Sequence, residues 1–316
     1  MHYRDDLPQL SEELFLTDGG LETTLIFHDG IDLPEFAAID LCSGPDGLDA
    51  LRSYYRRYLA IARERELGFV LESPTWRASP GWAERIGYSE EQLKQLNMRA
   101  IELMEELRDE QLGSGSTEPI VISGCIGPQG DGYSPEQILS SAAAQSYHRA
   151  QVETFAGTAA DMVTAITMTY VEEAIGIAVA AGDAGMPSAI SFTVETDGRL
   201  PSGEALGEAI ERVDVASEVP PAYYMINCAH PTHFAAAIGG DEPWRERIRG
   251  LRANASTMSH TELDEATELD EGDPVDLGAR HGALRDKLPH LTVLGGCCGT
   301  DHRHVGEICT AWIEAG

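Results

Sequence analysis

The chain has 316 residues, and 42% of them are hydrophobic, which is enough for a folded core and excludes a disordered or fibrous protein. Asp and Glu number 53 against 22 Lys and Arg, so a formal net charge of −31 opposes binding to nucleic acids and to anionic membranes. No apolar run approaches the roughly 20 residues that span a bilayer, and the N-terminal MHYRDDLPQLSEELF lacks the apolar stretch of a signal peptide. We therefore expect a soluble, cytoplasmic protein, and the scarcity of lysine indicates a salt-adapted or GC-rich source.

Eight short, nearly continuous apolar runs are typical of parallel strands buried on both faces. In chain order they are 14–18, 68–73, 120–124, 162–167, 189–194, 223–228, 251–255 and 291–298. Segments with helical periodicity lie between them, at 46–67, 90–112, 135–157, 171–184, 204–216, 231–238, 274–288 and 302–314. Ser89 and Ser134 are the predicted N-caps of the second and third helices. This alternation predicts an α/β fold, a single (β/α)8 TIM barrel domain over residues 1–316. A doubly wound sheet is the alternative, and it would not need eight regularly spaced strands.

Two segments depart from the repeat. Residues 112–118 (LGSGSTE) are rich in Gly and Ser and predict a turn between a helix and a strand. Residues 261–276 are rich in Asp and Glu, which is typical of a solvated surface.

Polar, small and cysteine residues gather where the predicted strands end. In a (β/α)8 barrel the chemistry lies at the C-terminal ends of the strands. The residues there are Asp18, Glu72, Ser123, Thr167, Ser191, Asn227, Cys228, Asn254 and the run Gly295-Gly-Cys-Cys-Gly.

Cys228, Cys297 and Cys298 are the most informative of these residues. Neighbouring side chains of a regular strand point to opposite faces, so Cys297 and Cys298 can meet at one ion only if the backbone bends there. Gly295, Gly296 and Gly299 permit such a bend. Three thiolates form a soft site that suits Zn²⁺ and leaves its fourth position open, as in catalytic zinc sites.

Other interpretations of the cysteines and nearby histidines stay open. Free cysteines are often small buried hydrophobic residues, which is the interpretation we prefer for Cys42, Cys125 and Cys309. A vicinal disulfide would be strained and is disfavoured in a reducing compartment. The histidines near the cysteines could join as ligands, but we favour surface, capping or supporting roles for His230, His233, His302 and His304.

The motifs of this chain, taken in order, resemble those of the homocysteine S-methyltransferase family. They are Asp18-Gly-Gly, Gly124-Cys-Ile-Gly-Pro128, Ser191-Phe-Thr193, Asn227-Cys228 and Gly295-Gly-Cys-Cys-Gly-Thr300. The matches run over nearly the whole chain, and the GGCC run with an upstream NC is specific.

The resemblance implies a methyltransferase with a Zn²⁺ ion held by Cys228, Cys297 and Cys298. The thiol of the acceptor, homocysteine, would enter the fourth position and become methionine, an activity of methionine biosynthesis. Coordination favours the thiolate at neutral pH, where a free thiol is mostly protonated. No catalytic residues beyond the zinc ligands are then required.

The methyl donor is less constrained by the sequence. The chain ends soon after the cysteine pair, without a cobalamin or folate module, so we expect a small sulfonium donor such as S-methylmethionine or S-adenosylmethionine. Trp76 and Trp82 are candidates for contact with such a cation, although packing in a loop is the more ordinary role. A homo-oligomer is compatible with the sequence.

Two positions depart from the family pattern. The glutamate that binds the amino group of homocysteine falls on Ile166, and a second common glutamate falls on Thr24. An isoleucine cannot accept a hydrogen bond, so another residue replaces the glutamate or the acceptor is a different small thiol. The candidates for substrate binding are Asp18, Glu22, Ser191, Glu195, Asn227 and Asn254.

Two further hypotheses come from other classes of protein. One is a barrel lyase or hydrolase without zinc, in which Asp18 or Glu72 does acid–base chemistry and the cysteines are incidental. The other is a metal-binding protein whose site is closed and inert.

Overall fold

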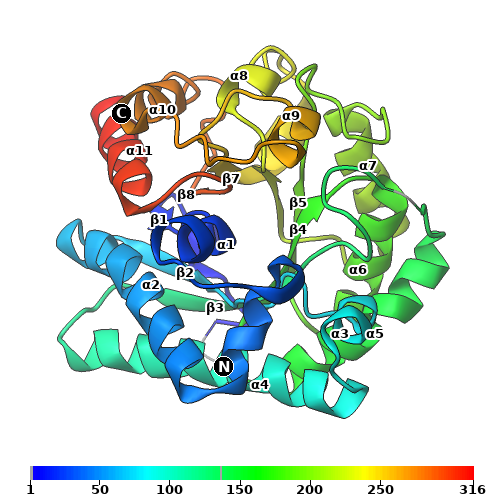
Figure 1. Cartoon of the computed structure of the whole chain (residues 1–316). Coiled ribbons are helices and arrows are strands. Elements are labelled where there is room, and N and C mark those ends of the chain that lie inside the picture. Colours follow the sequence, from blue (N-terminus) through cyan, green and yellow to red (C-terminus); the bar gives the residue numbers. More distant parts are fainter. Residues whose placement is uncertain (1–2, 136) are drawn as a thin grey trace.

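A computed structural model describes residues 3–135 and 137–316 of the chain. Eight parallel strands close into a barrel in the order β1 to β8, with helices between them, which confirms the predicted (β/α)8 barrel (Figure 1). The strands are β1 Phe15–Leu16, β2 Gly68–Glu72, β3 Ile120–Ile126, β4 Met162–Met168, β5 Ser188–Phe192, β6 Tyr223–Asn227, β7 Ile248–Ala253 and β8 Val293–Gly296. Each contains part of one of the eight predicted runs.

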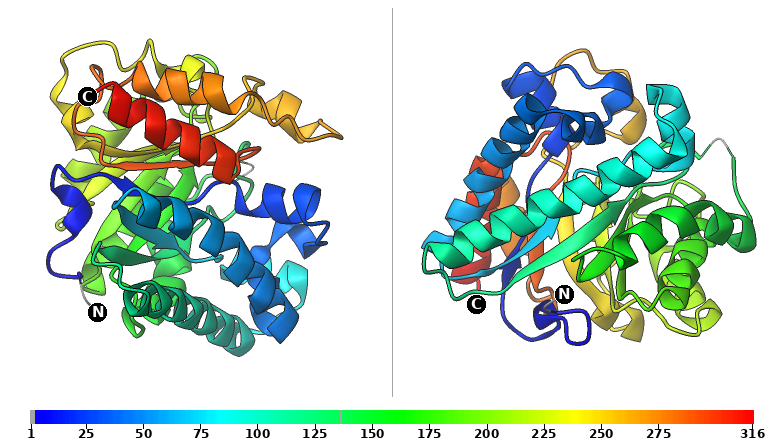
Figure 2. Two further views of the ribbon diagram at one scale, coloured as in Figure 1. Left: turned by 90° about the vertical axis from the view of Figure 1, so that its left-hand side faces the viewer. Right: turned by 90° about the horizontal axis from the view of Figure 1, so that it is seen from below.

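The long helices also follow the predicted pattern. The α-helices are α1 Leu21–Thr23, α2 Pro45–Glu64, α3 Pro80–Ile86, α4 Glu90–Gly113, α5 Ser141–Ala156, α6 Val171–Asp183, α7 Leu206–Ala216, α8 Pro231–Phe234, α9 His260–Asp264, α10 Pro274–Gly282 and α11 His302–Glu314. Shorter helical turns are Pro8–Leu10, Thr24–His28, Pro34–Phe36, Ala38–Ser43 and Pro243–Arg247. Figure 2 shows α10 and α11 packed side by side on the outside of the barrel. No helix among the described residues is long and apolar enough to cross a membrane.

Helix starts depend on local hydrogen bonds, and one predicted start is wrong. Ser89 caps α4 as predicted, with Gln92 completing a capping box. However, α5 does not begin after Ser134. The Asp131 side chain accepts hydrogen bonds from the backbone N–H groups of Tyr133 and Ser134 and holds a turn there. The helix α5 therefore begins six residues later than predicted, with Ser140 as its cap.

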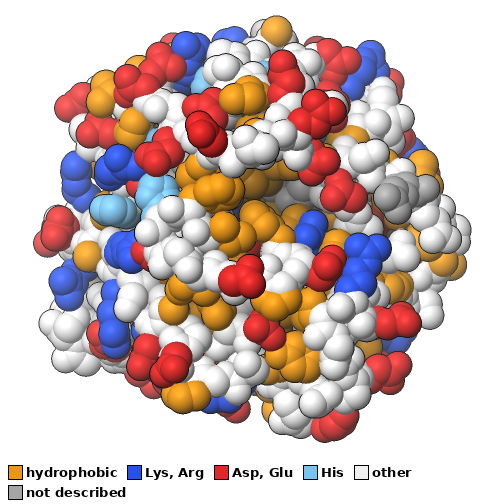
Figure 3. Space-filling view, in the orientation of Figure 1, with side chains coloured by type: hydrophobic (Ala, Val, Ile, Leu, Met, Phe, Trp, Pro, Cys, Tyr) orange, Lys and Arg blue, Asp and Glu red, His pale blue; other side chains and the backbone are white. Residues whose placement is uncertain are grey.

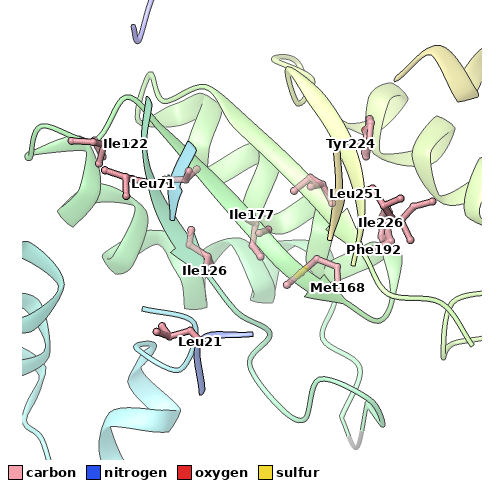
Figure 4. Packing of buried hydrophobic residues seen from close by; sticks show 14 of the residues in the cluster. Leu21, Leu71, Ile122, Ile126, Met168, Ile177, Phe192, Tyr224, Ile226 and Leu251 are labelled. Carbon is pink, nitrogen blue, oxygen red and sulfur yellow. The ribbon is translucent and has the colours of Figure 1, made fainter. Parts of the chain in front are cut away.

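The outer faces of the strands form the main hydrophobic core with the helices. Side chains such as Leu71, Ile122, Phe192 and Leu251 point outward and pack against helical residues such as Ile177 (Figure 4). Parallel strands covered in this way are buried on both faces, which explains their apolar sequences.

The inside of the barrel has two unlike ends. Near the strand N-termini it is filled by an apolar cluster of Leu7, Phe15, Val70, Val121, Met162, Ala189, Tyr223, Met225 and Val293. Because side chains alternate along a strand, the next inward layer is made of the residues two positions further on. That layer is polar and buried, and it contains Thr17, Glu72, Ser123, Thr164, Ser191 and Arg252. The cysteines lie above this polar layer.

Candidate active site and metal centre

Three cysteine sulfurs meet at the C-terminal end of the barrel. Cys228 directly follows β6, and Cys297 and Cys298 directly follow β8. Their Sγ atoms lie within 4.8 Å of one another. A disulfide joins Cys228 and Cys297, whose Cα atoms are 5.4 Å apart, and Cys298 is a free thiol. Reduction of the disulfide would place three thiols together, so these residues could hold a soft metal ion.

The backbone leaves strand geometry at these cysteines, as the sequence predicts. Cys228 has a φ of 51° and Gly299 a φ of 76°, both in the left-handed region. This conformation is costly for a residue with a Cβ, and such strain is typical of functional sites. At Gly296, a Cβ would collide with the Thr300 side chain, so glycine is required there for close packing.

Two polar side chains lie next to the sulfurs. The Tyr133 hydroxyl donates a hydrogen bond to the Cys298 sulfur at 3.3 Å, and its ring stacks on His260 with centroids 4.3 Å apart. The Asn227 amide nitrogen lies 3.9 Å from the Cys297 sulfur. Burial raises the pKa of Cys298, and the hydrogen bond from Tyr133 opposes that increase because it stabilises the thiolate.

A cavity of about 430 Å³ opens above the three sulfurs. Figure 3 shows a hollow on this face of the molecule, with hydrophobic side chains within it and acidic side chains nearby. Aromatic residues of the wall include Phe27, Phe36, Trp76 and Tyr133. A mixed apolar and acidic wall of this size suits a small organic cation.

The floor of the cavity contains a buried group of three charged residues. Arg252 donates to Asp18 at 2.7 Å and to the carbonyl oxygens of Gly19 and Gly296. The second oxygen of Asp18 accepts a hydrogen bond from Tyr54 at 2.9 Å. Asp18 is therefore neutralised by Arg252 and is fully engaged.

Glu72 completes this group, but it is only partly satisfied. Glu72 is 4% exposed, lines the cavity, and its Oε2 atom has no hydrogen-bond partner among the described residues. Burial raises its pKa to about 7, although the nearby Arg252 opposes the shift. Glu22 also lines the cavity, and burial raises its pKa to about 7 as well. Because burial disfavours the charged form of both carboxyl groups, a cation bound in the cavity would stabilise their carboxylate forms.

The acidic segment predicted to be plain solvated surface has a second role. Most of its side chains are exposed, as expected, but Leu263, Ala266 and Leu269 line the cavity. The segment is held down by contacts of Glu271 with Arg303, at 2.6 Å, and of its carbonyl with His304, at 2.8 Å. The prediction missed this wall because it used only the acidic composition of the segment. The segment's position depends on contacts with α11, which composition does not reveal.

The predicted substrate-binding residues divide into two groups. Asp18 and Glu22 line the cavity, and Ser191, Glu195, Asn227 and Asn254 do not.

The second group supports the cysteine-bearing loops instead. Ser191 donates to the Asn227 side chain at 2.6 Å, Asn254 donates to the Cys228 carbonyl at 3.1 Å, and Glu195 pairs with His260 at 3.0 Å. His260 in turn contacts the Cys228 carbonyl at 2.7 Å. The geometry favours a supporting role for these four residues over direct contact with substrate.

The supporting roles expected of the histidines are largely confirmed. His230 caps α8, and His304 forms a capping box with Asp301 at the start of α11. His233 contacts the Thr257 carbonyl at 2.9 Å, and His302 is exposed.

The remaining cysteines and the two tryptophans are also placed. Cys42, Cys125 and Cys309 are buried and free, as expected, although Cys125 also lines the cavity. Trp76 lines the cavity as well, whereas the Trp82 ring is covered by guanidinium groups at 4.0 and 4.5 Å.

The two departures from the family pattern occupy different places. Ile166 lines the cavity, and Thr24 is buried outside it. A bulge in β4, where Thr167 has a φ of 67°, turns both Ile166 and Thr167 toward the cavity. The wall at this point therefore has an apolar side chain.

Sequence reasoning missed three residues of the site: Arg77, Tyr133 and Arg252. Arg252 was detectable, because a charged residue inside a predicted strand needs a buried partner. Arg77 and Tyr133 lie in loops, where no periodicity indicates the direction of a side chain.

The fold and the site together define a class: a barrel enzyme with three cysteines beneath a substrate-sized cavity. A family model for homocysteine S-methyltransferase matches residues 15–312. The chain therefore belongs to the homocysteine S-methyltransferase family, and it is an enzyme that transfers a methyl group to homocysteine.

Solved structures show the same fold. The oxidized form of the homocysteine methyltransferase MmuM from Escherichia coli is 19% identical, with a TM-score of 0.74 over 96% of this chain and 97% of that one. The metallated form of that protein is 18% identical, with a TM-score of 0.73 over 95% and 96% of the two chains. A search of curated proteins finds no match.

Proposed function

We propose that this enzyme is zinc-dependent and moves a methyl group from a small sulfonium donor to the sulfur of homocysteine, giving methionine. The convergence of three cysteine sulfurs at the base of the cavity carries the proposal. Cys228, Cys297 and Cys298 would hold the ion as thiolates. When bound, Zn²⁺ would favour the thiolate form of the acceptor at neutral pH. A reducing cytoplasm would keep the three cysteines available for it.

The reaction needs positioning more than acid–base catalysis. A new bond forms between the acceptor sulfur and the methyl carbon, the carbon–sulfur bond of the donor breaks, and the donor leaves as a neutral thioether. The acceptor's thiol proton goes to solvent. Because the donor is already activated by its positive charge, the protein has to align the two sulfurs and exclude competing water.

The acidity of the cavity supports a cationic donor. The acidic residues that line the wall are Glu22, Asp131, Asp264, Glu268 and Asp270. The lining has two basic residues, Arg77 and Arg252, and Arg252 is neutralised by Asp18. We therefore propose S-methylmethionine or S-adenosylmethionine as the donor.

Mass spectrometry tests the proposal directly. The reduced, zinc-loaded protein is incubated with homocysteine and each sulfonium donor, and methionine is measured. One zinc per chain and methionine formed with at least one donor would support the proposal. Protein that holds zinc but forms no methylated thiol would contradict it.

X-ray absorption at the zinc edge adds an independent test of the open position. We expect three sulfur ligands without substrate and a fourth after homocysteine is added. Four sulfur ligands already present in the absence of thiol would indicate a closed, inert site.

A second candidate is the same chemistry on a different small thiol. The apolar side chain of Ile166 in the cavity wall favours it, because this residue cannot bind an ammonium group. An acceptor without an α-amino group, such as 4-mercaptobutanoate, would then be methylated faster than homocysteine.

A further inference from the structure

Two oppositely charged side chains line the cavity without pairing with each other. Glu22 lies in α1, and Arg77 lies in the loop after β2. Among the described residues, no basic nitrogen lies within salt-bridge distance of the Glu22 carboxylate. Their charges still act on each other through space, since Arg77 opposes the rise in the pKa of Glu22. The two groups therefore face the same cavity without forming a salt bridge with each other.

The Arg77 guanidinium is held in place by aromatic rings and keeps one donor free. It lies over the rings of Trp82, Trp76 and Phe36, at 4.0, 5.0 and 5.8 Å from their centroids. One nitrogen donates to the Glu35 carbonyl, and another is 3.9 Å from Asp131. The Nε atom is buried and has no hydrogen-bond partner among the described residues. An unpaired buried donor is costly, so the protein leaves the hydrogen-bonding capacity of this guanidinium incompletely used.

The other charged groups of the floor are less suited to a ligand with both charges. Asp18 is neutralised by Arg252 and has both oxygens engaged. Glu72 has a free oxygen, but its charged neighbour is Arg252, whose guanidinium already donates to Asp18 and to backbone carbonyls. Glu22 has no salt-bridge partner among the described residues, and the one ionic contact of Arg77, with Asp131, is long at 3.9 Å. Glu22 and Arg77 are thus the pair of opposite charges that is best placed to bind a ligand with both charges.

We propose that Glu22 and Arg77 together bind the head group of an α-amino acid, which deepens the proposed function and rests on it. The Glu22 carboxylate accepts hydrogen bonds from the ammonium group, and the Arg77 guanidinium donates to the carboxylate. A zwitterion carries both charges on one carbon, so it fits a pair that is too far apart to form its own salt bridge. Ile166 need not contribute to amino-group recognition in this arrangement.

Two substrates share this head group. Homocysteine is one, and an amino-acid sulfonium donor such as S-methylmethionine is the other. The chemistry of recognition is the same for both, so the experiment has to distinguish them.

Calorimetry with methionine and two truncated analogues tests the pair without turnover. One analogue, 4-(methylthio)butanoate, lacks the ammonium group, and the other, 3-(methylthio)propylamine, lacks the carboxylate. We expect the wild-type protein to bind methionine about 10- to 100-fold more tightly than either analogue, because each charged hydrogen bond is lost in one of them. Equal affinity for all three ligands would overturn the proposal without any mutant.

Variants then assign each charge to its residue. Glu22→Gln should weaken the binding of methionine about 10-fold or more but leave the affinity for the butanoate analogue, which has no ammonium group, unchanged. Arg77→Gln should also weaken the binding of methionine about 10-fold or more, but leave the affinity for the propylamine analogue, which has no carboxylate, unchanged. Arg85→Gln is the matched control, since Arg85 also lies over the Trp82 ring, at 4.5 Å, but does not line the cavity. Asp32→Asn is the control for loss of an exposed acidic charge in a nearby loop. Unchanged methionine affinity in both site variants would overturn the assignment.

Steady-state kinetics identify which substrate uses the pair. If it binds the acceptor, Arg77→Gln and Glu22→Gln raise the KM for homocysteine and leave the KM for a sulfonium without an amino-acid head, such as trimethylsulfonium, unchanged. If it binds the donor, the KM for S-methylmethionine rises and that for homocysteine does not. A protein that forms no methylated product but still binds methionine through the pair would contradict the proposed function and leave this inference standing.

Discussion

The two ends of the barrel each contain a buried arginine–aspartate pair, and the pairs differ in what surrounds them. Near the strand N-termini, Arg108 pairs with Asp161 at 3.1 Å, and Asp161 also accepts hydrogen bonds from the backbone N–H groups of Tyr3 and Ile122. At the other end, Arg252 pairs with Asp18 beside a cavity. The first pair connects a helix to two backbone segments, and the second forms part of a substrate-sized space.

The neighbours of each pair explain the difference. The barrel interior near Asp161 is filled with apolar side chains, so nothing there can bind a ligand. Glu72 lies beside Arg252 with a free oxygen, and the cysteine sulfurs lie above it. The molecule therefore fills one end of its interior with apolar side chains and leaves a cavity for ligands at the other.

Removal of one thiol should have the largest effect on the functional end. We expect Cys228→Ala to lose zinc and to lower kcat/KM by more than about 1,000-fold, which is the scale of losing a group essential for transition-state stabilisation. Metal analysis and the methionine assay measure this. The control is Cys125→Ala, because Cys125 also lines the cavity but lies outside the three-sulfur cluster. Zinc retained in full by Cys228→Ala would exclude the proposed metal centre.

The two buried pairs should respond differently to loss of the aspartate. Asp161→Ala leaves Arg108 buried without its partner, so we expect the free energy of unfolding to fall by about 3–5 kcal/mol. Asp18→Ala should cost less, because Arg252 can turn toward the free oxygen of Glu72. Urea denaturation of both variants measures the difference. Equal losses would mean that Glu72 cannot substitute for Asp18.

The sequence predicts the barrel well because its strongest signal is local. A parallel strand covered on both sides has to be apolar over its whole length, so all eight strands were visible as runs. The helix starts were less predictable. Ser134 and Ser140 are equally good caps in the sequence. The choice depends on the hydrogen bonds that Asp131 accepts from the backbone, which the sequence does not reveal.

The site was predictable only where it depends on strand ends. The meeting of Cys228 with Cys297 and Cys298 follows from barrel topology, because parallel strands bring their C-terminal ends to one face. By contrast, the positions of Arg77 and Tyr133 depend on how their loops pack, and the pairing of Asp18 with Arg252 joins residues far apart in the chain. Such contacts have no periodic signature.

The unpaired carboxyl of Glu72 should make stability depend on pH. Its pKa is about 7 in the folded protein against an ordinary value of 4.5, so its contribution to stability is fully present below pH 4.5 and is lost as the pH rises through 7. A shift of this size corresponds to up to about 3 kcal/mol. We expect Glu72→Gln to become more stable than the wild type as the pH rises from 5 to 8.

Urea unfolding of the wild type and of Glu72→Gln at pH 5 and pH 8 isolates this contribution, since all other groups are common to both proteins. A difference between the two proteins that does not change with pH would show that Glu72 is already ionised at pH 5. Asp161→Asn offers the matched comparison at the closed end of the barrel.

Loss of the Tyr133 hydroxyl should have the smallest effect, because it removes one hydrogen bond from a site that keeps its three sulfurs. Tyr133→Phe retains the stacking on His260, so zinc content should not change, and kcat/KM should fall by about 2- to 10-fold. Tyr147→Phe is the control, since the Tyr147 hydroxyl bonds to Ser79 outside the cavity. A loss of zinc in Tyr133→Phe would mean that the hydroxyl holds the metal centre together, whereas a loss above about 100-fold with zinc retained would place it in contact with the reacting groups.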